Sequence, residues 1–121
     1  MGGRLQDKVA IITGGGSGIG LATAQMFHRE GAFVVLTGTS NLAMDAAAAL
    51  GKRASGIRGD ASKAADVAAV VDHAVKTFGG LDILCNVAGA SGPLSPVVET
   101  SEETFNEMID VNLRSVRRLC Q

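Results

Sequence analysis

The chain has 121 residues, of which 46% are hydrophobic and 19% charged, a composition typical of one folded globular domain rather than of a disordered chain. The formal net charge of −1 argues against a general affinity for nucleic acid or for anionic membranes. No apolar run approaches the roughly 20 residues of a membrane-spanning helix, and the first residues lack the apolar core of a secretory signal, so we expect a cytoplasmic protein with no nucleic-acid or membrane partner.

The first predicted element is a strand over 8–13, which contains the apolar run Val9 to Ile12. A glycine-rich turn over 13–20 follows and opens onto a segment of helical periodicity that ends at Gly31. Glycines let the backbone approach a ligand closely, and the unpaired N–H groups at a helix start attract an anion. This order predicts a phosphate-binding loop, with a turn that binds no ligand as the alternative.

The rest of the chain alternates between strand and helix. We expect further strands over 33–37, 54–59 and 82–86, and helices over 42–50, from 62 to about 78, and from about 100 onward. Ser62 and Thr100 are the expected N-caps, the second in a capping box with Glu103. The expected buried faces are Ile19, Ala22, Met26 and Phe27 in the first helix, Val67, Val70, Val71, Ala74, Val75 and Phe78 in the third, and Ile109, Leu113, Val116 and Cys120 in the last. We interpret Arg114, Arg117 and Arg118 as the solvent face of that last helix rather than as an RNA or lipid patch.

Four strands that alternate with helices indicate an α/β fold with a Rossmann-like, doubly wound parallel sheet. Right-handed crossovers give the order 3-2-1-4, an incomplete version of the full sheet. The order reverses between the first and fourth strands, so the glycine-rich turn and Asn86 should flank one crevice at the carboxyl ends. The fourth strand is apolar on both faces and would leave an unpaired edge, a site of aggregation or assembly.

Two residue types that often bind metals give no such signal here. Cys85 and Cys120 lie in apolar segments without metal-ligand spacing, and we interpret them as buried thiols rather than as a disulfide. His28 and His73 stand alone on predicted helices, where surface positions explain them better than metal ligation. We therefore expect no metal site.

The glycine spacing is T-G-x-x-x-G-x-G, with Gly14, Gly18 and Gly20 in the fixed places, and not a strict G-x-G-x-x-G. It resembles the cofactor loop of the short-chain dehydrogenase/reductase family. Three further motifs match that family in order, namely Asp60-Ala61, Asn86-Val87-Ala88-Gly89 and Asp110-Val111-Asn112-Leu113. The resemblance runs from Lys8 to the end and implies that residues 1–121 are an NAD(P)-binding Rossmann-like domain.

The resemblance also implies a role for each motif. The Asp60 carboxylate would accept a hydrogen bond from the adenine amino group, Asn86 would brace the central strands, and Asn112 would be the catalytic residue that interrupts its helix and holds a water in a proton relay. The implied cofactor-binding residues are Gly14, Ser17, Gly18, Ile19, Gly20, Thr39, Ser40, Asp60, Ala61, Asn86, Ala88 and Gly89. Val87 departs from the family's N-N-A-G, which puts one side-chain hydrogen bond in doubt. From the residues alone, Asp60 could be a turn residue and Asn112 a solvent-facing helix residue.

The cofactor implied is NADP or NAD. An acidic residue about 20 positions beyond the glycine loop binds the ribose 2′-OH and favours NAD, but 38–40 reads Gly-Thr-Ser, with neither an acid nor an arginine. The hydroxyls of Thr39 and Ser40 can hydrogen-bond a 2′-phosphate, whereas Ser17 occupies the place where NADP-preferring relatives often carry Arg. We favour NADP.

One element of the family is missing. Its members use a Tyr in a Y-x-x-x-K pair as general acid and a Ser to orient the substrate carbonyl, and this chain contains no Tyr. We therefore predict the cofactor-binding half of an NAD(P)-dependent oxidoreductase, inactive alone, that in the complete fold transfers a hydride between nicotinamide and a carbonyl or alcohol substrate and forms a homo-oligomer. The alternative is a non-catalytic dinucleotide-binding or dimerisation fragment. A methyltransferase or flavoprotein would fit the sheet but would leave the register of Asp60, Asn86 and Asn112 unexplained.

Overall fold

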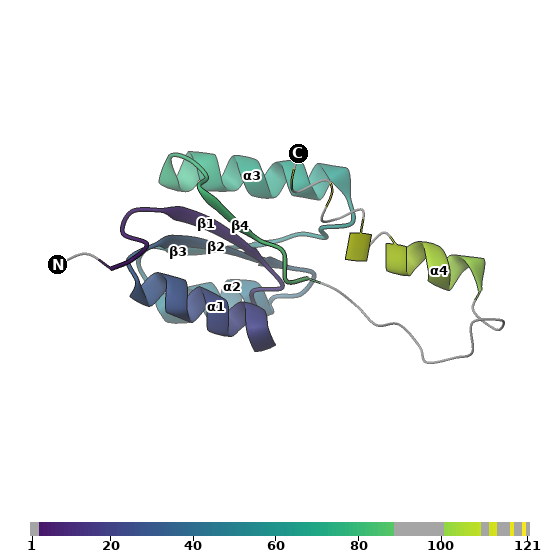
Figure 1. Cartoon of the computed structure of the whole chain (residues 1–121), viewed down its shortest axis with the longest axis horizontal. Helices are drawn as coiled ribbons and strands as arrows, with labels where there is room; N and C mark the ends of the chain where they lie inside the picture. Colours follow the sequence, from purple (N-terminus) through teal and green to yellow (C-terminus); the bar gives the residue numbers. More distant parts are fainter. Residues whose placement is uncertain (1–2, 89–100, 110–111, 114–116, 118–119, 121) are drawn as a thin grey trace.

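Residues 3–88, 101–109, 112–113, 117 and 120 are described by a computed structural model, in which a parallel sheet lies between helices (Figure 1). The elements in chain order are β1 (Val9–Thr13), α1 (Gly18–Arg29), β2 (Phe33–Gly38), α2 (Leu42–Leu50), β3 (Ala54–Arg58), α3 (Ala64–Phe78), β4 (Ile83–Cys85) and α4 (Glu102–Ile109). The strand order is β3-β2-β1-β4, with all three pairings parallel. The predicted fold class and strand order are confirmed.

The two central strands are long apolar runs because helices cover both of their faces. All of β1 is buried, as is β2 from Val34 to Thr37. One face of β1, with Ala10 and Ile12, packs beneath α1 and α2, and the other face packs beneath α3. Figure 1 shows α1 and α2 together on one side of the sheet and α3 on the other. The sheet is therefore the middle layer of three.

The fourth strand lies at the edge of the described sheet. β4 pairs with β1 through Ala10–Ile83, Ile11–Leu84 and Ile12–Cys85. All three β4 residues are half-buried, whereas β1 is wholly buried. Within the described part of the chain the open apolar edge expected from the sequence is present.

The buried face of α1 differs from the predicted one. Gly20 and Ala24 are the buried residues, and Phe27 is half-buried, whereas Ile19 is 76% exposed and Met26 is 43% exposed. The cause lies at the first turn of the helix. A methyl group on Gly20 would overlap the carbonyl oxygen of Gly14, so the helix meets the loop and the sheet through its smallest side chains.

The ends of α3 and α4 also correct the expectations. Ser62 does not cap α3, which begins at Ala64; the Ser62 hydroxyl donates instead to Asp60. Gly79 follows α3 in the left-handed conformation, so the helix ends at Phe78, close to the predicted position. At α4 the Ser101 hydroxyl accepts the N–H of Thr104 at 3.0 Å, while Thr100 of the expected capping box lies outside the described residues. α3, the longest described helix, has 15 residues, and none of the described helices is long and apolar enough to cross a membrane.

Several apolar positions predicted to be buried are exposed. Leu113 is 60% exposed and Val75 on α3 is 46% exposed. Cys85 is half-buried and Cys120 is exposed, so the prediction of buried thiols is wrong for Cys120; both thiols are free. Arg117 is exposed, as expected, and the other members of its group, Arg114, Val116 and Arg118, lie outside the described residues.

Both histidines are half-buried and have structural hydrogen-bond partners. The Nε2 atom of His28 lies 2.7 Å from the carbonyl oxygen of Lys52, and Nε2 of His73 lies 2.8 Å from the Ser55 hydroxyl. These contacts join α1 to the turn before β3, and α3 to β3. Among the described residues, no group of three or more His, Cys, Asp or Glu side chains could hold a metal ion.

Candidate functional site

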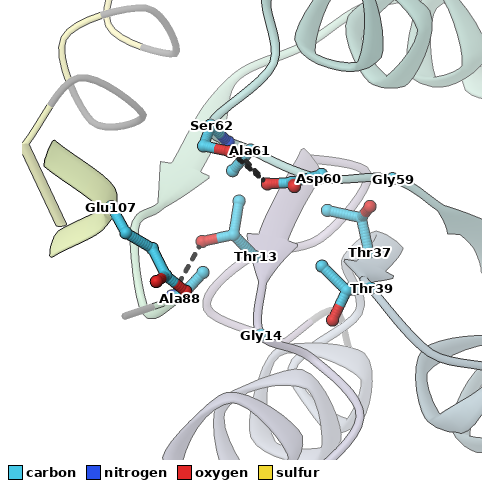
Figure 2. Close-up of a pocket in the computed structure, with 11 residues that line it drawn as sticks. Thr13, Gly14, Thr37, Thr39, Gly59, Asp60, Ala61, Ser62, Ala88 and Glu107 are labelled. Carbon is cyan, nitrogen blue, oxygen red and sulfur yellow. Dashed lines mark hydrogen bonds between the residues drawn. The ribbon is translucent and has the colours of Figure 1, made fainter. Parts of the chain in front are cut away.

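The carboxyl ends of the strands surround a cavity of about 400 Å³, here called the strand-end cavity (Figure 2). It is lined by Thr13, Gly14, Thr37, Gly38, Thr39, Gly59, Asp60, Ala61, Ser62, Ala88 and Glu107. A second cavity of about 250 Å³, here called the loop cavity, lies between the glycine-rich turn and the start of α2. It is lined by Gly14, Gly16, Ser17, Gly38, Thr39, Ser40, Leu42 and Ala43. The two cavities share residues from the ends of β1 and β2.

The structure brings together most, but not all, of the predicted site residues. Gly14, Thr39, Asp60, Ala61 and Ala88 line the strand-end cavity, and Gly14, Ser17, Thr39 and Ser40 line the loop cavity. Gly18, Ile19 and Gly20 form the first turn of α1. Asn86 and Asn112 line neither cavity, and Gly89 lies outside the described residues.

The glycine-rich turn has two kinds of glycine. Gly20 is required by packing, because a methyl group there would overlap the Gly14 carbonyl oxygen. Gly18 has a positive φ of 55°, and a Cβ atom built on it meets no atom within 4 Å. The first turn of α1 contains no acidic side chain that would oppose the positive end of the helix dipole. The open space beside Gly18 is therefore suited to an anion.

Thr13, the last residue of β1, connects the two strands that flank the strand-end cavity. Its buried hydroxyl accepts the backbone N–H groups of Val87 at 3.0 Å and Ala88 at 3.1 Å, and it donates to the carbonyl oxygen of Cys85 at 3.3 Å. These bonds fix the segment after β4, where Asn86 was expected to act as the brace. The sequence alone did not reveal this role, because a threonine is ordinary at the end of a strand.

Asp60 is held in a tight turn on one wall of the strand-end cavity. One of its carboxylate oxygens accepts the Ser62 hydroxyl at 2.6 Å and the Ser62 N–H at 2.9 Å (Figure 2). The backbone N–H of Asp60 in turn donates to Asp66 of α3 at 2.8 Å. The Ser62 hydroxyl bond lowers the pKa of Asp60, partial burial opposes this, and the Ser62 N–H and the charge of Lys63 add to the lowering. Asp60 is therefore a negatively charged acceptor at neutral pH.

Arg58, the last residue of β3, reaches the loop that follows β2. Parallel pairing places it opposite Gly38, and its Nε atom donates to the carbonyl oxygen of Thr39 at 3.0 Å. Ser40, at the start of α2, accepts the N–H of Leu42 at 3.3 Å through its hydroxyl. The sequence analysis missed Arg58 because it lies 19 positions from Thr39. Aligning the ends of β2 and β3 in register would have found it.

Two more cavity residues had no sequence signal. Thr37 is 4% exposed, and its hydroxyl has no hydrogen-bond partner within the described part of the chain. A buried hydroxyl without a partner is uncommon. Glu107, from α4, adds a second carboxylate to the cavity lining in addition to that of Asp60, and Figure 2 shows its side chain on the side of Ala88. From the sequence, Glu107 would be interpreted as a solvated charge on the surface of a helix.

Asn86 and Asn112 are the two asparagines predicted to belong to the site, and neither lines the strand-end cavity or the loop cavity. Asn86 is exposed, and its side-chain amide donates to the sulfur of Cys120 at 3.8 Å. Asn112 is exposed and lies with Leu113 in a π-helical turn beyond Ile109, where α4 ends. The catalytic role of Asn112 and the cofactor contact of Asn86 stay predictions.

Comparisons with known proteins point to one family. The model of the short chain dehydrogenase family matches residues 8–121. The chain is 45% identical over 113 residues to momilactone A synthase of Oryza sativa subsp. japonica, covering 91% of this chain and 41% of that protein. It is 37% identical over 120 residues to cyclohexanol dehydrogenase of Acinetobacter sp. (strain SE19), covering 96% and 48%.

A solved structure gives the same picture. The 3-ketoacyl-(acyl-carrier-protein) reductase of Brucella melitensis, complexed with NADH, superposes with a TM-score of 0.92 at 36% identity. The match covers 97% of this chain and 48% of that one. The chain therefore spans about half the length of the relatives it matches.

Proposed function

This chain belongs to the short-chain dehydrogenase family, and we propose from that membership that it is the dinucleotide-binding half of an NAD(P)-dependent oxidoreductase. The complete protein would transfer a hydride between a nicotinamide cofactor and a carbonyl or alcohol substrate. The observation that carries the proposal is the convergence of Gly14, Thr39, Asp60, Ala61 and Ala88 on one cavity where the strand order reverses. Residues 1–121 would form a single domain of a cytoplasmic, homo-oligomeric enzyme.

The residues present fit the adenosine and phosphate part of the cofactor. The open space beside Gly18 and the start of α1 would hold the pyrophosphate. The ionised carboxylate of Asp60 would accept a hydrogen bond from the adenine amino group, and Ala61 would lie beside the adenine. Thr39 and Ser40, in the loop cavity, would hold the ribose and its 2′ substituent. When bound, the cofactor supplies the nicotinamide ring that gives or accepts the hydride.

The proposed cofactor is NADP in preference to NAD. The loop cavity lacks the acidic side chain that binds a free ribose 2′-OH in NAD-binding sites, as judged from its described lining residues. Two hydroxyl side chains, of Thr39 and Ser40, occupy that position. The NADH complex of the Brucella melitensis reductase supports a nicotinamide dinucleotide as the class of ligand.

We propose that catalytic turnover needs side chains that this sequence does not contain. The chain has no Tyr, so it cannot supply the family's Tyr general acid. Asn112 is the one catalytic residue that we propose here, as the holder of a water in a proton relay. We therefore expect the 121-residue chain to bind cofactor without reducing or oxidising a substrate.

A second candidate is a non-catalytic dinucleotide-binding or dimerisation fragment. It is favoured by apolar surface that the described chain leaves open. Phe105 on α4 is 58% exposed, Leu113 is 60% exposed, and β4 lies at the edge of the described sheet. Such a surface is suited to burial against another chain.

The experiment that separates the two candidates is the intact mass of the protein in its source cell, followed by an assay of NADPH-dependent reduction of ketones. A mass roughly twice the 12.3 kDa of this chain, with turnover, would support the oxidoreductase. A mass of 12.3 kDa with cofactor binding and no turnover would support the fragment. A folded protein of either mass that binds no dinucleotide would overturn the oxidoreductase and the dinucleotide-binding fragment, and would leave only a dimerisation fragment.

A further inference from the structure

Arg58 bonds to the lining shared by the two cavities through its cationic side chain. Its Nε atom donates to the Thr39 carbonyl oxygen at 3.0 Å, and Thr39 lines both cavities. The ladder continues past it, because the Gly59 N–H donates to the Gly38 carbonyl at 2.9 Å. The backbone from which Arg58 projects is therefore fixed against the end of β2.

The side of the sheet on which Arg58 projects follows from the alternation along β3. Ala54 packs into the core beneath α1 and α2, and a Cβ atom on Gly56 would meet Met44 of α2. Alternate residues of a strand point to the same face. Arg58 therefore projects on the α2 side, which is also the side of the loop cavity.

The groups around the loop cavity favour an anion. The start of α2 and the hydroxyls of Ser17, Thr39 and Ser40 line it or lie beside it, and its described lining includes no acidic side chain. The acid in the first turn of α2, Asp45, lines a separate groove between α1 and α2. The described wall of the loop cavity thus contains no carboxylate that would neutralise the guanidinium of Arg58.

From this geometry we propose that Arg58 determines cofactor specificity by binding the 2′-phosphate of NADP from β3. The proposal rests on the proposed function and adds to it the residue that supplies the charge. The Nε bond to Thr39 uses one of the five N–H donors of the guanidinium and holds the group in place before the ligand arrives. A phosphate dianion accepts two parallel bonds from a guanidinium, whereas a ribose 2′-OH gains little from it.

The test measures dissociation constants of NADPH and NADH for the 121-residue chain by quenching of cofactor fluorescence. The variants are Arg58→Gln and Arg58→Lys, with Arg29→Gln as the control, since Arg29 is an exposed arginine at the far end of α1. Arg58→Gln is expected to weaken NADPH binding about tenfold or more and to change NADH binding less than about twofold. Arg58→Lys retains part of the NADPH affinity, and Arg29→Gln changes neither.

A second probe removes the nicotinamide half from the measurement. Adenosine 2′,5′-bisphosphate should compete with NADPH for the wild-type chain more strongly than AMP does. For Arg58→Gln, the two nucleotides should compete equally. Unchanged NADPH affinity in Arg58→Gln would overturn the Arg58 proposal and leave the proposed function standing. An equal loss of affinity for NADPH and NADH would do the same, because it would show that Arg58 only fixes Thr39. A folded wild-type chain that binds neither cofactor would overturn the proposed function itself, and the Arg58 proposal with it.

Discussion

The hydroxyl of Thr13 accepts the backbone N–H of Ala88 at 3.1 Å, joining two residues that are 75 positions apart in the chain. Both residues line the strand-end cavity. The same hydroxyl accepts the N–H of Val87 and donates to the carbonyl oxygen of Cys85. One buried side chain therefore ties the segment after β4 to the end of β1 at the cavity.

Thr13→Val should destabilise the chain and weaken cofactor binding. Valine has nearly the same shape, but it leaves two backbone N–H groups and one carbonyl without their partner in a site that is 2% exposed at Thr13. The expected loss is about 1–3 kcal/mol in the free energy of unfolding. Urea unfolding measures it. Thr13→Ser keeps the hydroxyl and should lose clearly less; a Thr13→Val chain as stable as the wild type would contradict the role of these hydrogen bonds.

Gly18→Asp should abolish dinucleotide binding while the chain stays folded. The side chain would enter the open space beside the glycine-rich turn and place a negative charge where the phosphates are proposed to bind. Gly79→Asp is the matched control, because Gly79 also has a positive φ and open space around it but lies at the far end of α3. Unchanged NADPH affinity in Gly18→Asp, measured by fluorescence titration, would refute the assignment of the turn.

The proposed contact of Asp60 with adenine can be tested from both sides of the bond. The wild-type chain should bind NADH more tightly than its hypoxanthine analogue, which lacks the 6-amino donor. Asp60→Ala should bind the two ligands equally, since the acceptor is gone. Calorimetry provides the four dissociation constants. A preference for NADH that persists in Asp60→Ala would assign the recognition of the amino group to another residue.

The lowered pKa of Asp60 also predicts a pH dependence of stability. Because the folded pKa lies below the ordinary value of 3.8, the ionised carboxylate stabilises the fold at pH values above 3.8, and this contribution is lost as the pH falls through the folded pKa. The difference in free energy of unfolding between the wild type and Asp60→Asn should therefore be constant near neutral pH and shrink in acid. A difference that does not change with pH would contradict the assignment.

The sequence was sufficient for the fold because the pattern of each strand and helix agreed with the others. α2 was predicted with its observed bounds, Leu42–Leu50, and the strand order followed from right-handed crossovers. The face of α1 was predicted wrongly, because periodicity alone selects the large side chains. Because Gly20 lies close to Gly14, α1 instead buries Gly20 and Ala24.

Site residues that belong to a sequence motif could be predicted. Site residues that are brought together only by the pairing of strands could not. Asp60 and Ala88 belong to motifs that can be read along the chain, and both line the strand-end cavity. Arg58 reaches Thr39 only because β3 pairs in parallel with β2, and Thr13 reaches Ala88 only because β4 lies beside β1. Such contacts depend on strand register, which a reading of single segments does not include.

Titration of the purified, folded 121-residue chain with NADPH and NADH decides whether the chain is a dinucleotide-binding unit. We expect saturable binding of one molecule per chain, with NADPH bound more tightly than NADH and with competition by adenine nucleotides. We also expect no change in the absorbance of the reduced cofactor when ketones are added. A folded chain that shows no saturable binding of either dinucleotide would refute its proposed role as a dinucleotide-binding unit.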